Sequence, residues 1–195
     1  MEYVKIMNKK TISVTIPCWS EERSIRQMYD RLMKVFREQL PLYDYEIIYV
    51  DDYSPDNTRA EIRKLCKEDS KVKAVFNARN FGFNRNVFAT LQYGSGDATF
   101  MLFGDLQDPP EILPQFVREW ENGHKVVVGQ KCKSNESKLM YSLRTVYYNL
   151  IGKLSDSNQI QHFNGFGLYD KTFIDVMRQI DDPNPYLKGL VAEFG

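Results

Sequence analysis

The residues best suited to chemistry lie at positions 105–110, which read Asp-Leu-Gln-Asp-Pro-Pro. They follow residues 98–103, a short apolar run rich in β-formers that predicts a buried strand. A strand that ends in carboxylates places hard oxygen ligands at the carboxyl edge of a sheet, where open α/β sheets bind ligands. Such oxygens suit Mg²⁺ or Mn²⁺, and these ions are commonly shared with substrate phosphates. Asp108 could instead only cap the next helix, whereas Asp105 comes before any cap.

Two other acidic pairs fall where predicted strands end: Glu21 with Glu22, and Asp51 with Asp52. In a parallel sheet these strand ends share one edge, and carboxylates gathered there repel one another unless a cation or hydroxyl donors use them. Asp56 is suited to capping the helix that follows the second pair. Asp51 and Asp52 precede that cap, so they could accept hydrogen bonds from ribose hydroxyls or from a base N–H.

The segments that position these acids alternate between strand and helix patterns. Strands are expected at 11–17, 45–52, 72–76, 98–103 and 125–129. Helices are expected from about Ser20, at 56–67, at 85–93 and at 111–121, with Pro17 stopping the first strand. Each crossover is long enough to join parallel strands. We therefore predict an α/β fold with a mostly parallel central sheet flanked by helices.

After Gly129 the pattern changes to an aromatic-rich helix at about 137–154 and then to residues 163–169, a glycine-containing strand or tight loop. We expect one domain over 1–195, with a nucleotide-binding half at 1–130 and an acceptor half at 131–195. The charge balance of 26 basic and 26 acidic residues disfavours a nucleic-acid partner. Three scattered cysteines and a charged N-terminus without an apolar signal core indicate a cytosolic location.

Five short segments occur along the chain in a defined order and spacing: 16–22, 50–58, 79–82, 96–97 and 105–111. Together they resemble family 2 glycosyltransferases, and most of all the branch that includes dolichol-phosphate mannose synthase and bacterial polyprenyl-phosphate sugar transferases. The resemblance covers nearly the whole chain, and its specificity comes from the combination of segments. It implies a GT-A fold, a nucleotide-sugar donor, a divalent metal ion and inversion at the anomeric carbon.

The resemblance also implies roles for single residues. The base pocket is expected to include Pro17, Trp19 and Glu21. Asp52, with Asp51 nearby, is expected to hold the nucleoside, and Arg79 to lie near the nucleotide. Asp105 and Gln107 are expected to face the metal ion and the diphosphate.

The sequence departs from the family pattern at the metal motif, because Phe103 stands where relatives often carry the first of two aspartates. One expected metal ligand is therefore absent. The resemblance also implies Asp105 and Glu193 as the candidate catalytic residues, with Glu193 as a general base. A base is needed only if the acceptor is a sugar hydroxyl, because a lipid phosphate is already anionic.

The expected reaction is transfer of a sugar, from a UDP-sugar by analogy with bacterial relatives, to a polyprenyl phosphate or a lipid-linked saccharide. Such a reaction would serve cell-surface polysaccharide synthesis at the cytoplasmic face of the plasma membrane. Because relatives of this branch usually continue into membrane-associated sequence, we expect the chain to be a catalytic fragment.

Other classes of protein remain possible on the residues alone. A receiver-type signalling domain would use Glu21, Asp51 and Asp52, but it would leave Asp105 unexplained. A nucleotidyltransferase or a dinucleotide dehydrogenase normally needs a glycine-rich loop after the first strand, and residues 18–23 contain no glycine. A catalytically impaired nucleotide-sugar-binding module, or a transferase acting on a soluble saccharide hydroxyl, is compatible with Phe103 and Glu193.

Overall fold

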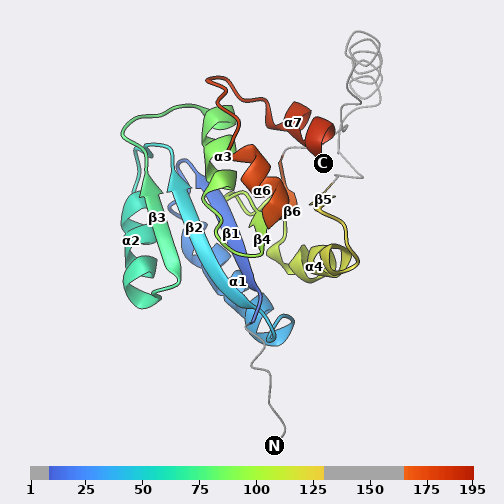
Figure 1. The fold of residues 1–195 in the computed structure, drawn as a ribbon. Helices are drawn as coiled ribbons and strands as arrows, with labels where there is room; N and C mark the ends of the chain where they lie inside the picture. The colour runs from blue at the N-terminus through green and yellow to red at the C-terminus, as the bar shows by residue number, and fades with distance from the viewer. Residues whose placement is uncertain (1–8, 130–164) are drawn as a thin grey trace, which may run out of the picture.

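The computed structural model describes residues 9–129 and 165–195, which build one sheet with helices on both faces (Figure 1). Within these residues the strand order is β3-β2-β1-β4-β6-β5. The strands are β1 Thr11–Cys18, β2 Asp44–Asp51, β3 Val72–Phe76, β4 Ala98–Met101, β5 Val126–Val128 and β6 Gly167–Asp170. β3, β2, β1 and β4 are mutually parallel, and β6 runs antiparallel to both of its neighbours. The predicted mostly parallel α/β sheet is confirmed.

The helices follow the strands as the sequence pattern requires. They are α1 Ile25–Glu38, α2 Thr58–Glu68, α3 Phe83–Gln92, the 3₁₀ turn η1 Pro110–Ile112, α4 Leu113–Glu121, α6 Lys171–Met177 and α7 Leu187–Phe194. α1 packs beside α2 and η1, whereas α3 packs beside α6 and α7 and over β1 (Figure 1). The side chains that α1 buries are Ile25, Met28, Leu32, Val35 and Phe36, at the spacing of one helix face.

Three local predictions need correction. Pro17 does not end β1, which continues to Cys18. The Thr15 carbonyl accepts from Leu102 on the β4 side, and the Cys18 carbonyl accepts from Asp52 on the β2 side. Pro17 therefore turns its missing N–H toward β4, beyond the last ladder pair of Thr15 with Met101.

The other two corrections concern an element's start and its end. α1 begins at Ile25, with Ser24 rather than Ser20 at its N-cap position, because residues 19–24 form a loop of their own. β4 ends at Met101 instead of continuing to 103, which frees Phe103 to turn away from the sheet ladder. The N-cap positions of η1 and α4 are held by Pro109 and Ile112.

The second half of the chain joins the sheet of the first through β6, which lies between β4 and β5. Asp170 ends this strand and caps α6 by accepting from the Thr172 amide at 2.9 Å. The Trp120 indole N–H donates to the other Asp170 oxygen at 2.8 Å, so α4 is fixed to the same point. The expected helix at 137–154 lies outside the described residues.

A buried carboxylate anchors the opposite edge of the sheet, remote from the acidic strand ends. Glu46 in β2 accepts from the Ser13 hydroxyl at 2.5 Å and from the Ser95 amide at 2.7 Å, and it pairs with Lys73 at 2.6 Å. Although burial alone would raise the pKa of Glu46, the Lys73 ammonium and the serine donors outweigh it and lower that pKa from 4.5 to about 2.

We expect Glu46→Gln to lower the free energy of unfolding at pH 7 by about 3 kcal/mol. The interactions that lower the pKa of Glu46 stabilise its ionised form in the folded protein, and the glutamine variant loses them. The stabilisation should be complete above about pH 4.5 and should disappear as the pH falls toward 2. Urea unfolding at several pH values measures it, with Glu38→Gln on the exposed end of α1 as the control. Equal stability of the two variants at pH 7 would contradict the account.

Candidate functional site

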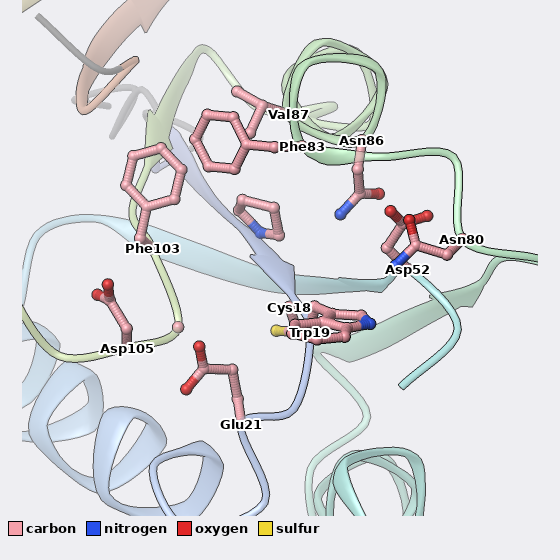
Figure 2. A pocket seen from close by; sticks show the side chains of 12 residues that line it. Cys18, Trp19, Glu21, Asp52, Asn80, Phe83, Asn86, Val87, Phe103 and Asp105 are labelled. Atoms are coloured by element: carbon pink, nitrogen blue, oxygen red, sulfur yellow. The ribbon is translucent and has the colours of Figure 1, made fainter. Parts of the chain in front are cut away.

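Three parallel strand ends bring the acidic residues together at one edge of the sheet. Cys18 in β1 pairs with Asp51 in β2, and Thr15 in β1 pairs with Met101 in β4. A cavity of about 340 Å³ opens just beyond these ends (Figure 2). The described residues that line it are Pro17, Cys18, Trp19, Glu21, Asp52, Asn80, Phe83, Asn86, Val87, Phe103, Gly104 and Asp105. The expectation that Asp52 and Asp105 share one edge is confirmed.

The loops after β1 and β2 hold each other in place through backbone donors. The amides of Ser20 and Glu21 donate to the hydroxyls of Ser54 and Thr58, at 2.9 and 2.7 Å. The Glu22 carboxylate accepts from the Asn57 amide at 3.0 Å. Glu22 therefore serves the loop structure, while its neighbour Glu21 lines the cavity.

A left-handed residue follows each of three cavity-lining side chains, one on each strand-end loop. Ser20 comes after Trp19 with φ 59°, Tyr53 after Asp52 with φ 64°, and Leu106 after Asp105 with φ 60°. Non-glycine residues rarely adopt this conformation. Where they do, they cluster at active sites and ligand-binding sites, where the surrounding structure holds the backbone in place. The backbone is thus turned sharply directly after each of these three lining residues.

Asp52 is buried and fixes the loop that follows β3. One carboxylate oxygen accepts from the Asn77 side chain at 2.8 Å and from the Phe81 amide at 2.9 Å. The other accepts from the Gly82 amide at 2.9 Å. Asp52 thus positions Asn80, Phe83 and the start of α3 around the cavity, a role that sequence reasoning missed.

Glu21 and Asp105 form the negative end of the cavity (Figure 2). Burial raises the pKa of Glu21 from 4.5, and the nearby Asp105 carboxylate raises it further, while a hydrogen bond from Ser24 lowers it. Gly104 lies between them, and a Cβ there would come within 3.3 Å of the Glu21 side chain. In the described parts of the chain neither carboxylate forms an ion pair with lysine or arginine. This end of the cavity is therefore suited to a cation.

Aromatic rings form the remaining walls. Trp19 is 54% exposed beside the cavity, although tryptophan is usually highly buried. Phe83, which is 62% exposed, stacks on the buried Phe103 with 5.6 Å between ring centroids. Sequence reasoning missed Phe83, Asn86 and Val87. The pattern predicted only a helix from about residue 85, which left Phe83 in the preceding loop, whereas α3 begins at Phe83.

The other predicted site residues are not among the described residues that line this cavity. Asp51 is fully buried, and its carboxylate pairs with Arg59 at 2.5 Å and accepts from the Ser54 amide. Arg79 is exposed and stacks over Phe81. Gln107 and Glu193 are exposed, the first in the loop after Asp105 and the second on α7. The structure does not bring these four side chains together with Glu21, Asp52 and Asp105 around the cavity.

Comparison with known proteins identifies relatives over nearly the whole chain. The glycosyl transferase family 2 model matches residues 13–186. An uncharacterized glycosyltransferase of Bacillus subtilis is 29% identical over 184 residues, covering 94% of this chain and 56% of that protein. A bactoprenol glucosyl transferase of Shigella phage SfV is 29% identical over 185 residues, covering 94% of this chain and 60% of its own length. The chain thus spans less than two thirds of these relatives.

Solved structures share the fold at lower sequence identity. A mannosyltransferase from Pyrobaculum calidifontis, in complex with GDP-Man and Mn²⁺, has a TM-score of 0.61 at 14% identity, covering 94% of this chain and 51% of that one. A glucosyl-3-phosphoglycerate synthase from Mycobacterium tuberculosis, bound to Mn²⁺, UDP and phosphoglyceric acid, has a TM-score of 0.58 at 19% identity, covering 84% and 57%. The expected GT-A fold is confirmed.

We expect Asp52→Ala to release the loop after β3, because three donors lose a charged acceptor in a buried place. The free energy of unfolding should fall by about 3 kcal/mol. The amides of Phe81 and Gly82 should exchange with solvent at least about tenfold faster, as measured by NMR. Asp30→Ala on the exposed side of α1 is the control, and unchanged exchange in the Asp52 variant would refute the clamp.

Proposed function

The chain belongs to glycosyl transferase family 2, and from this premise we propose that it is the catalytic part of an inverting glycosyltransferase. The reaction would move a sugar from a nucleotide-sugar to a polyprenyl phosphate or a lipid-linked saccharide. One observation carries the proposal. Glu21, Asp52 and Asp105, from three strand-end loops, line one cavity together with the exposed ring of Trp19.

The nucleoside is proposed to occupy the end of the cavity formed by Trp19, Asp52 and Asn80 (Figure 2). An exposed indole offers a flat apolar face for a base. The Asp52 carboxylate already accepts hydrogen bonds from two amides of the loop after β3. It would therefore shape this end of the cavity as well as contact a ligand. The two structural neighbours are bound to GDP-Man and to UDP, so similarity of fold does not identify the base of the nucleotide. Our choice of uridine follows the bacterial relatives.

The diphosphate and a Mg²⁺ or Mn²⁺ ion are proposed to lie at Glu21 and Asp105. Among residues 9–129 and 165–195 no three acidic, histidine or cysteine side chains form a metal cage. The two carboxylates nonetheless fit an ion of this kind, which commonly takes one or two carboxylates together with substrate phosphates. Asp105 accepts from the Gln107 amide through one oxygen, which fixes its orientation. When bound, the ion would neutralise the charge that develops on the departing nucleoside diphosphate.

The acceptor is proposed to be lipid-linked and to reach the site from a membrane surface at the cytoplasmic face. The support is similarity to a protein named as a bactoprenol glucosyl transferase, which is longer than this chain. In the part of the chain that the structure describes, no helix is both long and apolar enough to cross a bilayer. We assign residues 131–195 to the acceptor side, as the sequence pattern indicates.

A second candidate, a nucleotide-sugar-binding module with impaired catalysis, is favoured by Phe103. This residue occupies the place of a family aspartate, and its ring packs on Phe83 instead of offering an oxygen ligand. Measurement of turnover separates the two candidates, because both would bind the donor.

We expect UDP to bind more tightly with Mn²⁺ than without it, because the ion offsets repulsion between the diphosphate and the two carboxylates. Asp105→Ala should abolish this metal dependence, while Asp30→Asn should preserve it. Isothermal titration with and without EDTA measures both. Equal affinity of the parent protein in the two conditions would count against the metal site.

Glu193→Gln tests which atom of the acceptor attacks. If the nucleophile is a lipid phosphate, the variant should retain most of the transfer rate, because an anion needs no deprotonation. If it is a sugar hydroxyl, the rate should fall on the order of 10²-fold or more. The rates are measured in the full-length protein with polyprenyl phosphate and with lipid-linked saccharide as separate acceptors. Transfer only to a soluble sugar would refute the lipid-linked acceptor.

A further inference from the structure

Phe83 is an unusual surface residue because its exposed ring is held in a defined orientation. It is 62% exposed, yet it stacks on Phe103, which is 8% exposed, with an interplanar angle of 16°. Phe103 is fixed in turn by its burial among core residues. The outer face of Phe83 is thus a preorganised apolar surface, which loses little conformational entropy when a ligand packs against it.

The position of this pair links two cavities. Phe83 and Phe103 both line the cavity that contains Glu21 and Asp105, on the side away from Glu21 in Figure 2. Phe83 also lines a neighbouring cavity of about 420 Å³, together with Arg85, Asn184 and Tyr186. Phe83 therefore stands at the boundary between the proposed donor pocket and the surface groove beside it.

The wall of the cavity also changes from apolar to negatively charged over a short distance. Only Gly104 separates Phe103 from Asp105, so an apolar surface directly adjoins the carboxylates proposed to face the diphosphate. In a nucleotide-sugar the group attached to the outer phosphate is a sugar ring. Such a ring has an apolar face of C–H groups, which packs on aromatic rings, and an edge of hydroxyls, which needs polar partners. Asn84 and Asn184 line the adjoining cavity, and their amide groups are of a kind that can supply such partners.

We propose that Phe83, supported by Phe103, is a specificity-determining platform that binds the apolar face of the transferred sugar. This inference rests on the proposed function, since it requires a nucleotide-sugar donor. Phe103 then has a positive role, because the family aspartate at this place could not support the ring of Phe83. The platform would act on the sugar and leave the nucleotide unaffected.

The test compares each donor with its own nucleoside diphosphate by isothermal titration in Mn²⁺. UDP-glucose, UDP-N-acetylglucosamine and GDP-mannose are titrated first, and the donor that the parent protein binds most tightly is carried forward. Phe83→Ala should weaken this donor about tenfold and should change the affinity of the nucleoside diphosphate by less than about twofold. Phe83→Tyr, which keeps the ring, should retain the parent affinity for the donor.

Tyr93→Ala supplies the matched control, because Tyr93 is an exposed aromatic residue at the opposite end of α3. It should change neither affinity. Equal weakening of donor and nucleoside diphosphate by Phe83→Ala would place the ring against the nucleotide and overturn the inference. Unchanged donor affinity with a raised KM for the lipid acceptor would also overturn it. If the parent protein binds none of the three donors, both the proposed function and this inference fail. If it binds a donor but Phe83→Ala does not weaken that donor selectively, only this inference fails, so the two failures are distinguishable.

Discussion

Carboxylates gathered at one edge of a sheet repel one another, and the different partners that this chain gives to each of them set the shape of its site. Asp51 is paired with Arg59 inside the fold. Asp52 is surrounded by amide donors from the loop after β3. Glu21 and Asp105 receive hydrogen bonds from Ser24 and from the Gln107 amide, without an ion pair in the described residues. The remaining negative charge is therefore concentrated at one end of the cavity.

This distribution explains why neighbouring acids have different roles. Asp51 is the last residue of β2 and Asp52 follows it directly, yet the two side chains have different partners. One reaches Arg59 on α2, and the other reaches the cavity. Glu21 and Glu22 divide in the same way, with Glu22 closing the loop against Asn57. Asp51 and Glu22 therefore support the loops, whereas Glu21 and Asp52 line the space where a ligand would bind, and Asp52 also holds the loop after β3.

The sequence alone predicted the parts of the fold that depend on local pattern. Strand β3 was expected at 72–76 and is found there, because a short run rich in apolar residues between polar residues defines it. It could also be predicted that Asp52 and Asp105 lie at the same edge of the sheet, because parallel strands joined by crossovers place their carboxyl ends together. The start of α1, the end of β4 and the role of Asp52 could not be predicted. They depend on hydrogen bonds between residues far apart in the chain, such as Phe81 with Asp52. The stacking of Phe83 on Phe103 was equally invisible, because neither residue's neighbours in sequence indicate it.

The central claim is that Glu21 and Asp105 form the place where a metal ion and a nucleoside diphosphate meet. A crystal structure of the protein with UDP and Mn²⁺, with anomalous diffraction data collected at the manganese edge, tests it most directly. We predict one strong anomalous peak within coordinating distance of an Asp105 oxygen, on the side of the cavity that faces Glu21, with the uracil ring beside Trp19. A manganese peak and a bound nucleotide found elsewhere on the protein, with this cavity filled only by water, would contradict the account.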